Sequence, residues 1–340
     1  MPKHPTLFIT HRGERHQQAA LDAAPAELDV MLRRSPSKDE IIALLPGKEF
    51  LITERSGEID ADIIRAGHDL RLIQRLGAQT HDIDLEAARA AGVPVCTLSV
   101  VGCIRVAEHM LLQMLACAKK LRESIDVTLS AEDFGHPPRR CDEDYFAYNW
   151  AGRQDIRGLW GVTVGILGYG EIGTELARRL AGFCCKVLYN KRNPLPAAAE
   201  REMGIQFAAV NELVAASDYV CMLLPLFPET EQSLNREFFA RMKSDAIFVS
   251  CGGSGVVDDE ALAEAVASGH LYGAAVDTFT FEPIALDSPL LSVARNPQAN
   301  LILTPHTAAG ASSANRNDRG DDYANLTRVL RGEALVGRVA

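Results

Sequence analysis

The fold is decided by the stretch Gly161-Val162-Thr163-Val164-Gly165-Ile166-Leu167-Gly168-Tyr169-Gly170-Glu171-Ile172-Gly173. Its residues 162–167 are apolar and partly β-branched, which predicts a short buried strand. Residues 174–181 follow with helical periodicity, so the G-x-G-x-x-G pattern stands where a strand turns into a helix. This context is typical of dinucleotide binding, because the glycines let the backbone approach a pyrophosphate and the helix N-terminus offers N–H groups to it. We therefore expect a cofactor to contact Gly168, Tyr169, Gly170, Glu171 and Ile172.

The composition is that of a globular protein with about two domains. Of its 340 residues, 47% are hydrophobic and 24% are charged. A net charge of −10 without a dense basic run argues against nucleic acid or a membrane surface as a partner. No apolar stretch is expected to reach the roughly 18 residues of a spanning helix, and the N-terminus lacks an apolar signal segment. The eight cysteines include no C-x-x-C pair, which favours reduced thiols in a cytoplasmic protein and no metal site.

Strand and helix patterns alternate along nearly the whole chain. The first part carries predicted strands at 6–10, 50–53, 71–76 and 93–97, with a helix at 84–91, and it ends near residue 102. A long helix at 106–121 and a polar, irregular stretch at 126–150 follow. The second part carries predicted strands at 162–167, 186–189, 219–224, 246–251, 273–276 and 301–303. Such alternation predicts an α/β protein with parallel sheets, and the last helix, at 318–331, is expected to return to the first domain.

Several blocks, taken in their order, resemble the D-isomer-specific 2-hydroxyacid dehydrogenase family. The blocks are Val106-Ala107-Glu108-His109, the glycine motif, Leu224–Thr230, Gly255–Asp258, Asp277–Pro283 and Thr304-Pro305-His306. The resemblance covers almost the whole chain. It implies two Rossmann-like domains: a substrate-binding, flavodoxin-like domain of residues 1–102 plus 308–340, and an NAD(P)-binding domain of residues 103–307. It further implies an active site in the cleft between them, a homodimer formed through the cofactor domain, and reduction of 2-oxo acids to D-2-hydroxy acids.

Reduction of a ketone requires a hydride from the nicotinamide and a proton for the oxygen. A histidine suits the second task because its pKa lies near neutrality, and a neighbouring carboxylate orients the ring and favours its charged form. His306 and Glu282 each follow a predicted strand, and both match the catalytic pair of the family. Asp277 matches the family's carboxylate near the nicotinamide; its alternative role is to cap the turn that follows.

One residue departs from the family pattern. Relatives carry an arginine just before the Gly-Gly-Val-Val-Asp block, where it clamps the substrate's carboxylate and carbonyl. Counting back from Val256-Val257-Asp258, and independently from Glu282, puts Gly253 at that position. A charge-assisted contact of this kind contributes about 1.5–3 kcal/mol to binding. Its absence therefore predicts a loss of ordinary 2-oxo acid activity or a change of substrate, unless another residue takes its place.

Three interpretations of the missing arginine stay open. Another arginine replaces it, either Arg105 at the start of the long helix or Arg55 after the second predicted strand. Alternatively, the substrate is not a simple 2-oxo acid, and residues 252–254 make room for a bulkier or neutral carbonyl compound. In the third interpretation the protein keeps its cofactor site but does little chemistry. The first domain also departs from the family at Gln79-Thr80-His81, where the residues that face the substrate are bulkier and more polar than glycine; Gln79 is expected to contact it.

The end of the second predicted strand of the cofactor domain favours NADP(H) over NAD(H). NAD-selective sites place an acidic residue there, bonded to the ribose 2′-hydroxyl. This chain has Asn190, Lys191 and Arg192 instead. Basic side chains attract the 2′-phosphate that a carboxylate would repel; the alternative is a protein that takes either cofactor. By resemblance, further contacts come from Leu224 and Pro225 beside the adenine ribose or pyrophosphate, and from Cys251 and Gly252 beneath the nicotinamide ribose.

Two classes of function follow. The first is an oxidoreductase in which His306 is the proton donor. The second is a non-catalytic, co-repressor-like protein in which NADP(H) occupancy switches a dimer. The intact His306–Glu282 pair favours the enzyme, and the missing arginine favours the regulatory alternative.

Overall fold

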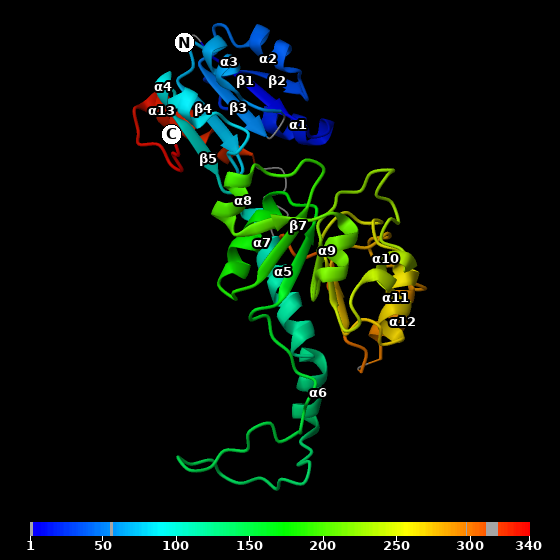
Figure 1. Cartoon of the computed structure of the whole chain (residues 1–340). Helices are drawn as coiled ribbons and strands as arrows, with labels where there is room; N and C mark the ends of the chain where they lie inside the picture. Colours follow the sequence, from blue (N-terminus) through cyan, green and yellow to red (C-terminus); the bar gives the residue numbers. More distant parts are fainter. Residues whose placement is uncertain (1–2, 55–56, 297, 311–318) are drawn as a thin grey trace. The chain divides into compact units, whose positions relative to one another are not determined.

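The structure is a computed structural model that describes residues 3–54, 57–296, 298–310 and 319–340 (Figure 1). It divides into two compact units. The first joins Met1–Val101 with Ala311–Ala340, and the second is Gly102–Gly310. In both units the strands pair in parallel and alternate with helices, so the α/β class expected from the sequence is confirmed.

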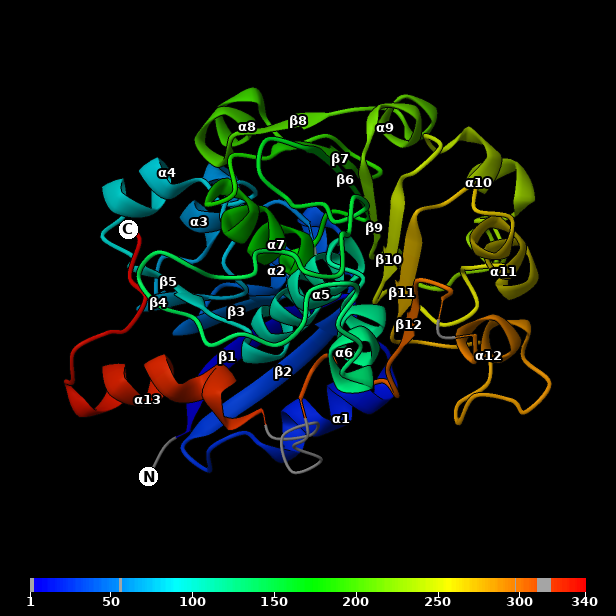
Figure 2. The same cartoon turned by 90° about the horizontal axis from the view of Figure 1, so that it is seen from below.

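The first unit is built on a parallel sheet with the strand order β2-β1-β3-β4-β5, counted over the described residues. The strands are β1 His4–Thr10, β2 Leu28–Arg34, β3 Phe50–Glu54, β4 Leu72–Leu76 and β5 Val95–Leu98; the helices are α1 Glu14–Asp22, α2 Lys38–Leu44, α3 Ala61–Ala66 and α4 Leu85–Ala90. Successive strand residues point to opposite faces, so Leu7 and Leu51 pack under α2, α3 and α4, whereas Phe8 and Phe50 pack on the face of α1 (Figure 2). The sequence did not predict β2, because it is an edge strand that ends in two exposed arginines.

The C-terminal segment completes the second face of this sheet. The turn η2 Gly320–Tyr323 leads into α13 Ala324–Arg331, where the sequence predicts a helix from residue 318, a position outside the described residues. Tyr323 and Leu326 are fully buried against Phe8, and the Tyr323 hydroxyl donates a hydrogen bond to the Ala20 carbonyl at 2.6 Å. The C-terminal helix therefore supplies part of the core of the first unit.

The second unit is built on a parallel sheet with the order β12-β11-β10-β9-β6-β7-β8 in the described part of the chain. The strands are β6 Thr163–Leu167, β7 Lys186–Asn190, β8 Ile205–Phe207, β9 Tyr219–Met222, β10 Ile247–Ser250, β11 Gly273–Val276 and β12 Leu301–Leu303. The helices are α7 Glu171–Ala181, α8 Ala197–Met203, α9 Val210–Ala216, α10 Arg236–Arg241, α11 Asp259–Ala267 and α12 Pro289–Ala294. The strand order reverses between β6 and β9, and ligands bind at the carboxyl ends of strands at such a point.

The long helix predicted at 106–121 is two helices, α5 Val101–Ala118 and α6 Leu121–Ser130. They are separated at Lys120, whose backbone is left-handed with φ 44°. The expectation that no apolar stretch reaches the length of a membrane span is wrong by length and composition alone, since α5 has 18 residues and a mean hydropathy of 1.3. One face of α5, including Met110, Met114 and Cys117, is buried in the core of this unit, which accounts for its apolar sequence.

The segment that follows α5 stands away from the body of the second unit (Figure 1). Helix α6 has no buried residue, and residues 131–150 are exposed except for a half-buried Tyr145. Apolar side chains at helical spacing, Leu121, Ile125 and Leu129, line α6 and are 42%, 47% and 77% exposed. We call residues 121–150 the arm.

Candidate active site

The catalytic candidates follow neighbouring strands of the second unit. Asp277 comes directly after β11 and Thr304 directly after β12, and these strands pair in parallel, so both residues lie at the same sheet edge. Glu282 and His306 lie in the loops that begin there. The local sequence thus brings four polar residues to the carboxyl edge of the sheet, where open α/β sheets bind ligands.

The structure brings His306 and Glu282 together. The Nδ1 atom of His306 lies 2.7 Å from Oε2 of Glu282. The other carboxylate oxygen, Oε1, accepts hydrogen bonds from the backbone N–H of Phe279 at 3.0 Å and from the Ser254 hydroxyl at 3.3 Å. Burial alone would raise the pKa of Glu282, but the hydrogen bonds from His306 and Phe279 hold it below its usual value. The carboxylate is therefore fixed in its ionised form beside the imidazole.

Asp277 is fully buried, and its carboxylate accepts hydrogen bonds from the loop that carries His306. Its Oδ1 atom accepts hydrogen bonds from the Thr304 hydroxyl at 2.5 Å and from the backbone N–H of Thr307 at 3.1 Å. Its Oδ2 atom accepts one from the N–H of Ala308 at 2.9 Å. These contacts are with the loop after β12, and not with the turn directly after Asp277 that its alternative role would cap.

The glycine motif has the geometry that a pyrophosphate requires. Gly168 has φ +89°, and an added Cβ there would lie 2.6 Å from the carbonyl oxygen of Leu223, so only glycine fits. Gly173 packs closely on β6, with the position of an added Cβ 3.3 Å from the Ile166 side chain. At Gly170, the N-cap of α7, an added Cβ would meet nothing within 4 Å. The turn therefore exposes backbone at the N-terminus of an eleven-residue helix, which fits a dinucleotide phosphate.

The residues predicted to select the cofactor lie at the carboxyl end of β7. The Asn190 side chain donates a hydrogen bond to the Ala208 carbonyl at 2.9 Å, so its amide joins β7 to the chain after β8. Lys191 is half-buried and Arg192 is exposed. Basic side chains thus stand where NAD-selective sites carry a carboxylate.

Gly253 is held against the backbone of the preceding loop. Its N–H donates to the Leu224 carbonyl at 2.7 Å, and an added Cβ would lie 2.4 Å from the backbone nitrogen of Leu226 and 3.0 Å from the carbonyl carbon of Pro225. Real Cβ atoms do not approach backbone so closely, so no side chain fits at Gly253 in this conformation. The neighbouring Cys251 is buried, and Gly252 packs equally closely, with its added Cβ 2.5 Å from Sδ of Met222.

The predicted substrate-binding residues are distributed over both units. Arg105 is exposed at the start of α5 and lies beside Gly310, where an added Cβ would be 3.1 Å from Nη1 of the arginine. This places Arg105 next to the loop that carries His306. Gln79 lies in the first unit and is buried after β4. Arg55 lies outside the described residues.

Sequence reasoning missed the neighbours of the catalytic pair. His109 and Thr304 were quoted only as parts of motifs, and Gln113 was assigned no role, yet His109 and Gln113 each form a hydrogen bond with the Thr304 hydroxyl. The available signal was the spacing of His109 and Gln113, which puts two polar residues on one face of an otherwise apolar helix.

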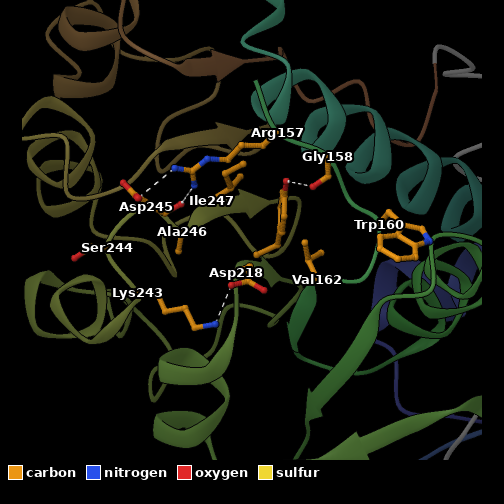
Figure 3. Close-up of a pocket in the computed structure, with 11 residues that line it drawn as sticks. Arg157, Gly158, Trp160, Val162, Asp218, Lys243, Ser244, Asp245, Ala246 and Ile247 are labelled. Atoms are coloured by element: carbon orange, nitrogen blue, oxygen red, sulfur yellow. Dashed lines mark hydrogen bonds and ion pairs between the residues drawn. The ribbon is translucent and has the colours of Figure 1, made fainter. Parts of the chain in front are cut away.

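A pocket of about 600 Å³ lies at the opposite edge of the sheet (Figure 3). It opens at the amino ends of β6, β9 and β10 and is walled by two ion pairs, Arg157–Asp245 at 3.2 Å and Lys243–Asp218 at 2.8 Å. Because His306 lies at the carboxyl edge, this pocket is separate from the candidate active site. Among the described residues, no three His, Cys, Asp or Glu side chains are grouped so that they could hold a metal ion.

Comparisons with known proteins agree with the geometry of the candidate active site. The profile of the family described as D-isomer specific 2-hydroxyacid dehydrogenase, NAD binding domain, matches residues 137–308. Hydroxypyruvate reductase from Thermotoga maritima is 31% identical over 82% of this chain and 84% of that relative. D-3-phosphoglycerate dehydrogenase from Mycobacterium leprae is 31% identical over 96% of this chain but only 58% of the relative, so the chain spans little more than half of its length. A crystal structure of a protein from Pyrococcus horikoshii OT3 has a TM-score of 0.57 at 26% identity, covering 99% of this chain and 95% of that one.

Proposed function

Since this chain belongs to the D-isomer-specific 2-hydroxyacid dehydrogenase family, we propose that it interconverts a 2-oxo acid and a D-2-hydroxy acid by hydride transfer. The observation that carries the proposal is the His306–Glu282 pair, joined at 2.7 Å. A binding protein does not need a histidine held by an ionised carboxylate at the ligand-binding edge of the sheet. The regulatory alternative is for this reason not favoured.

Glu282 binds one of the two ring nitrogens of His306, and this contact decides which nitrogen can transfer a proton to the substrate. Because Nδ1 of His306 donates to the carboxylate, Nε2 is the nitrogen that can face a substrate oxygen. The nicotinamide, when bound, supplies the hydride. In the reducing direction the Nε2 proton of His306 passes to the carbonyl oxygen, and in the oxidising direction Nε2 takes the hydroxyl proton. Glu282 stabilises the imidazolium and fixes the ring orientation in both directions.

The cofactor is a nicotinamide dinucleotide, and we propose that NADP(H) is preferred. The backbone of residues 168–172 and the N-terminus of α7 would hold the pyrophosphate. Support for NADP(H) comes from the end of β7, where Lys191 and Arg192 stand in place of a carboxylate. Leu224 and Pro225 remain proposed contacts beside the adenine ribose or pyrophosphate. Cys251 and Gly252 remain proposed contacts beneath the nicotinamide ribose; an added Cβ at Gly252 would lie 2.9 Å from the Leu224 carbonyl oxygen.

The substrate carboxylate requires a cation other than one at residue 253. Because backbone atoms occupy the space where a side chain at Gly253 would begin, the clamp must come from elsewhere in the chain. Arg105 is supported by its place beside Gly310, four residues beyond His306 in the same loop. Arg55 and Gln79 stay proposed contacts from the first unit. We assign the substrate to the small 2-oxo acids that the names of the relatives suggest, with hydroxypyruvate as the first to test.

A homodimer formed through the second unit is part of the proposal. The arm exposes a stripe of leucine and isoleucine on α6, and Phe146 and Tyr148 beyond it are 68% and 86% exposed. An apolar surface of this kind is typical of a protein interface, and a second copy offers a self-complementary partner. A cytoplasmic location is supported by the eight cysteines, none of which is paired in a disulfide.

The activity is tested by following the loss of NADPH absorbance with hydroxypyruvate, glyoxylate, pyruvate and phenylpyruvate, and with carboxylate-free ketones. NADH is assayed in parallel. We expect turnover of at least one 2-oxo acid, abolished in His306→Ala and reduced in Glu282→Gln. Turnover of neutral ketones alone, or turnover that survives His306→Ala, would refute the proposed mechanism.

A further inference from the structure

Two polar side chains lie on the buried face of the apolar helix α5. Gln113 is 2% exposed and the His109 side chain is 15% exposed, one helical turn apart. Buried polar groups must find partners, because leaving them without hydrogen bonds is costly. Their partners lie in the loop that carries His306.

The contacts converge on the hydroxyl of Thr304. Nε2 of His109 lies 3.1 Å and Nε2 of Gln113 lies 3.2 Å from Thr304 Oγ1, and Thr304 in turn donates to Asp277 at 2.5 Å. The hydroxyl thus accepts two hydrogen bonds and donates one, which uses its full capacity. Because its only proton goes to Asp277, His109 must carry a proton on Nε2. The amide oxygen of Gln113 accepts a hydrogen bond from the Cys251 thiol at 3.3 Å. This contact fixes the orientation of the amide, with its NH2 group toward Thr304.

The Asp277 carboxylate binds the chain on both sides of His306. Its carboxylate binds the side chain of Thr304, two residues before the histidine, and the N–H groups of Thr307 and Ala308, which follow it. Nε2 of His109 lies 3.5 Å from the same carboxylate. His306 itself has φ 52°, a left-handed conformation that a non-glycine residue keeps only when its surroundings hold it.

We infer that His109 and Gln113 are positioning residues, which act through Thr304 and Asp277 to hold the loop of residues 304–308 and so direct the His306 imidazole. The inference rests on the proposed function, since it assigns these residues to the proton transfer of that reaction. Neither residue touches the substrate in this account. Their effect is exerted on the orientation of a group whose misplacement by about 1 Å can lower a rate by about a hundred-fold.

The test uses paired variants of the full chain. Thr304→Val keeps the shape but removes the hydroxyl, and Thr304→Ser restores it; His109→Leu removes the donor, and His109→Gln keeps one. Thr163→Val and His270→Leu are matched controls, because they change the same residue types at the opposite edge of the same sheet. We expect kcat to fall about ten- to a hundred-fold in Thr304→Val and His109→Leu. The KM of the 2-oxo acid and the Kd of the cofactor should stay near parent values, and Thr304→Ser and His109→Gln should recover most of kcat.

A second readout does not depend on turnover. With isotope-labelled histidine, the ring signals of His306, assigned by their loss in His306→Ala, are followed against pH by NMR. We expect a changed titration midpoint in Thr304→Val and His109→Leu and an unchanged one in both control variants. Unchanged His306 signals, or a loss of kcat matched by an equal loss of cofactor affinity, would overturn the inference. If the parent turns over no 2-oxo acid, the proposed function fails, and the NMR titration alone decides whether these residues position His306.

Discussion

Restoring an arginine at residue 253 should damage the protein and should not improve it. An added Cβ would meet the backbone nitrogen of Leu226 at 2.4 Å and the carbonyl carbon of Pro225 at 3.0 Å. Both contacts are with backbone, so rotation of a side chain cannot relieve them and the loop must move. Overpacking of this kind costs about 1–3 kcal/mol. For a unit the size of Gly102–Gly310, each kcal/mol lowers the unfolding temperature by roughly 2–4 °C, which gives a decrease of about 2–12 °C for Gly253→Ala.

The assay is thermal unfolding of Gly253→Ala, followed by circular dichroism, with Gly158→Ala as the matched control. Gly158 lies in the same unit, is exposed, and has nothing within 4 Å of an added Cβ, so its substitution should change stability by less than about 0.5 kcal/mol. Gly253→Arg should be at least as unstable as Gly253→Ala and should gain no 2-oxo acid turnover. If Gly253→Ala unfolds at the parent temperature, or if Gly253→Arg raises kcat/KM for a 2-oxo acid, the steric explanation is wrong.

Three further predictions concern charge and the arm. Burial and the neighbouring Asp258 raise the pKa of Asp259 from 3.8 to about 6, so its ionisation in the folded state costs stability as the pH rises through that value. Asp259→Asn should therefore unfold at a higher temperature than the parent at neutral pH and at the same temperature below pH about 3.8, as measured by thermal melts across pH. Arg192→Glu should raise the KM of NADPH about ten-fold or more while leaving that of NADH nearly unchanged, since a lost charge-assisted contact is worth about 1.5–3 kcal/mol; equal effects on both cofactors would contradict the preference for NADP(H). If the proposed homodimer forms through the arm, Leu129→Glu should convert it to a monomer in light scattering, whereas Leu286→Glu, at a similarly exposed leucine of the same unit, should not.

Much of the fold could be predicted from local patterns. The strand–turn–helix at 163–181 and the strands β11 and β12 are short, apolar and bounded by glycine or proline, and the sequence predicts them closely. The strands that escaped prediction are β2, a half-exposed edge strand, and β8, which has three residues. The break between α5 and α6 at Lys120 was also missed, because a left-handed lysine leaves no mark in hydrophobic periodicity.

The site was only partly predictable, for a physical reason. His306 and Glu282 are separated by 24 residues and each sits after a strand, so parallel pairing of β11 with β12 brings them to one edge. His109 and Thr304 are 195 residues apart, and their contact depends on how α5 packs, which no local pattern encodes. Likewise the sequence shows that Gly253 is not an arginine, but the backbone contacts that exclude any side chain there follow only from the close packing of two loops.

The placement of Tyr323 and Leu326 in the first unit has a consequence for synthesis on the ribosome. Strands β1 to β5 are complete once Leu98 has been made, yet the side chain of Tyr323, which packs against Phe8, arrives 225 residues later. At translation rates of about 5–20 residues per second, this face of the sheet lacks the Tyr323 side chain for about 11–45 s. The second unit is synthesised whole within that interval. The part of the chain made first is therefore the part whose core is completed last.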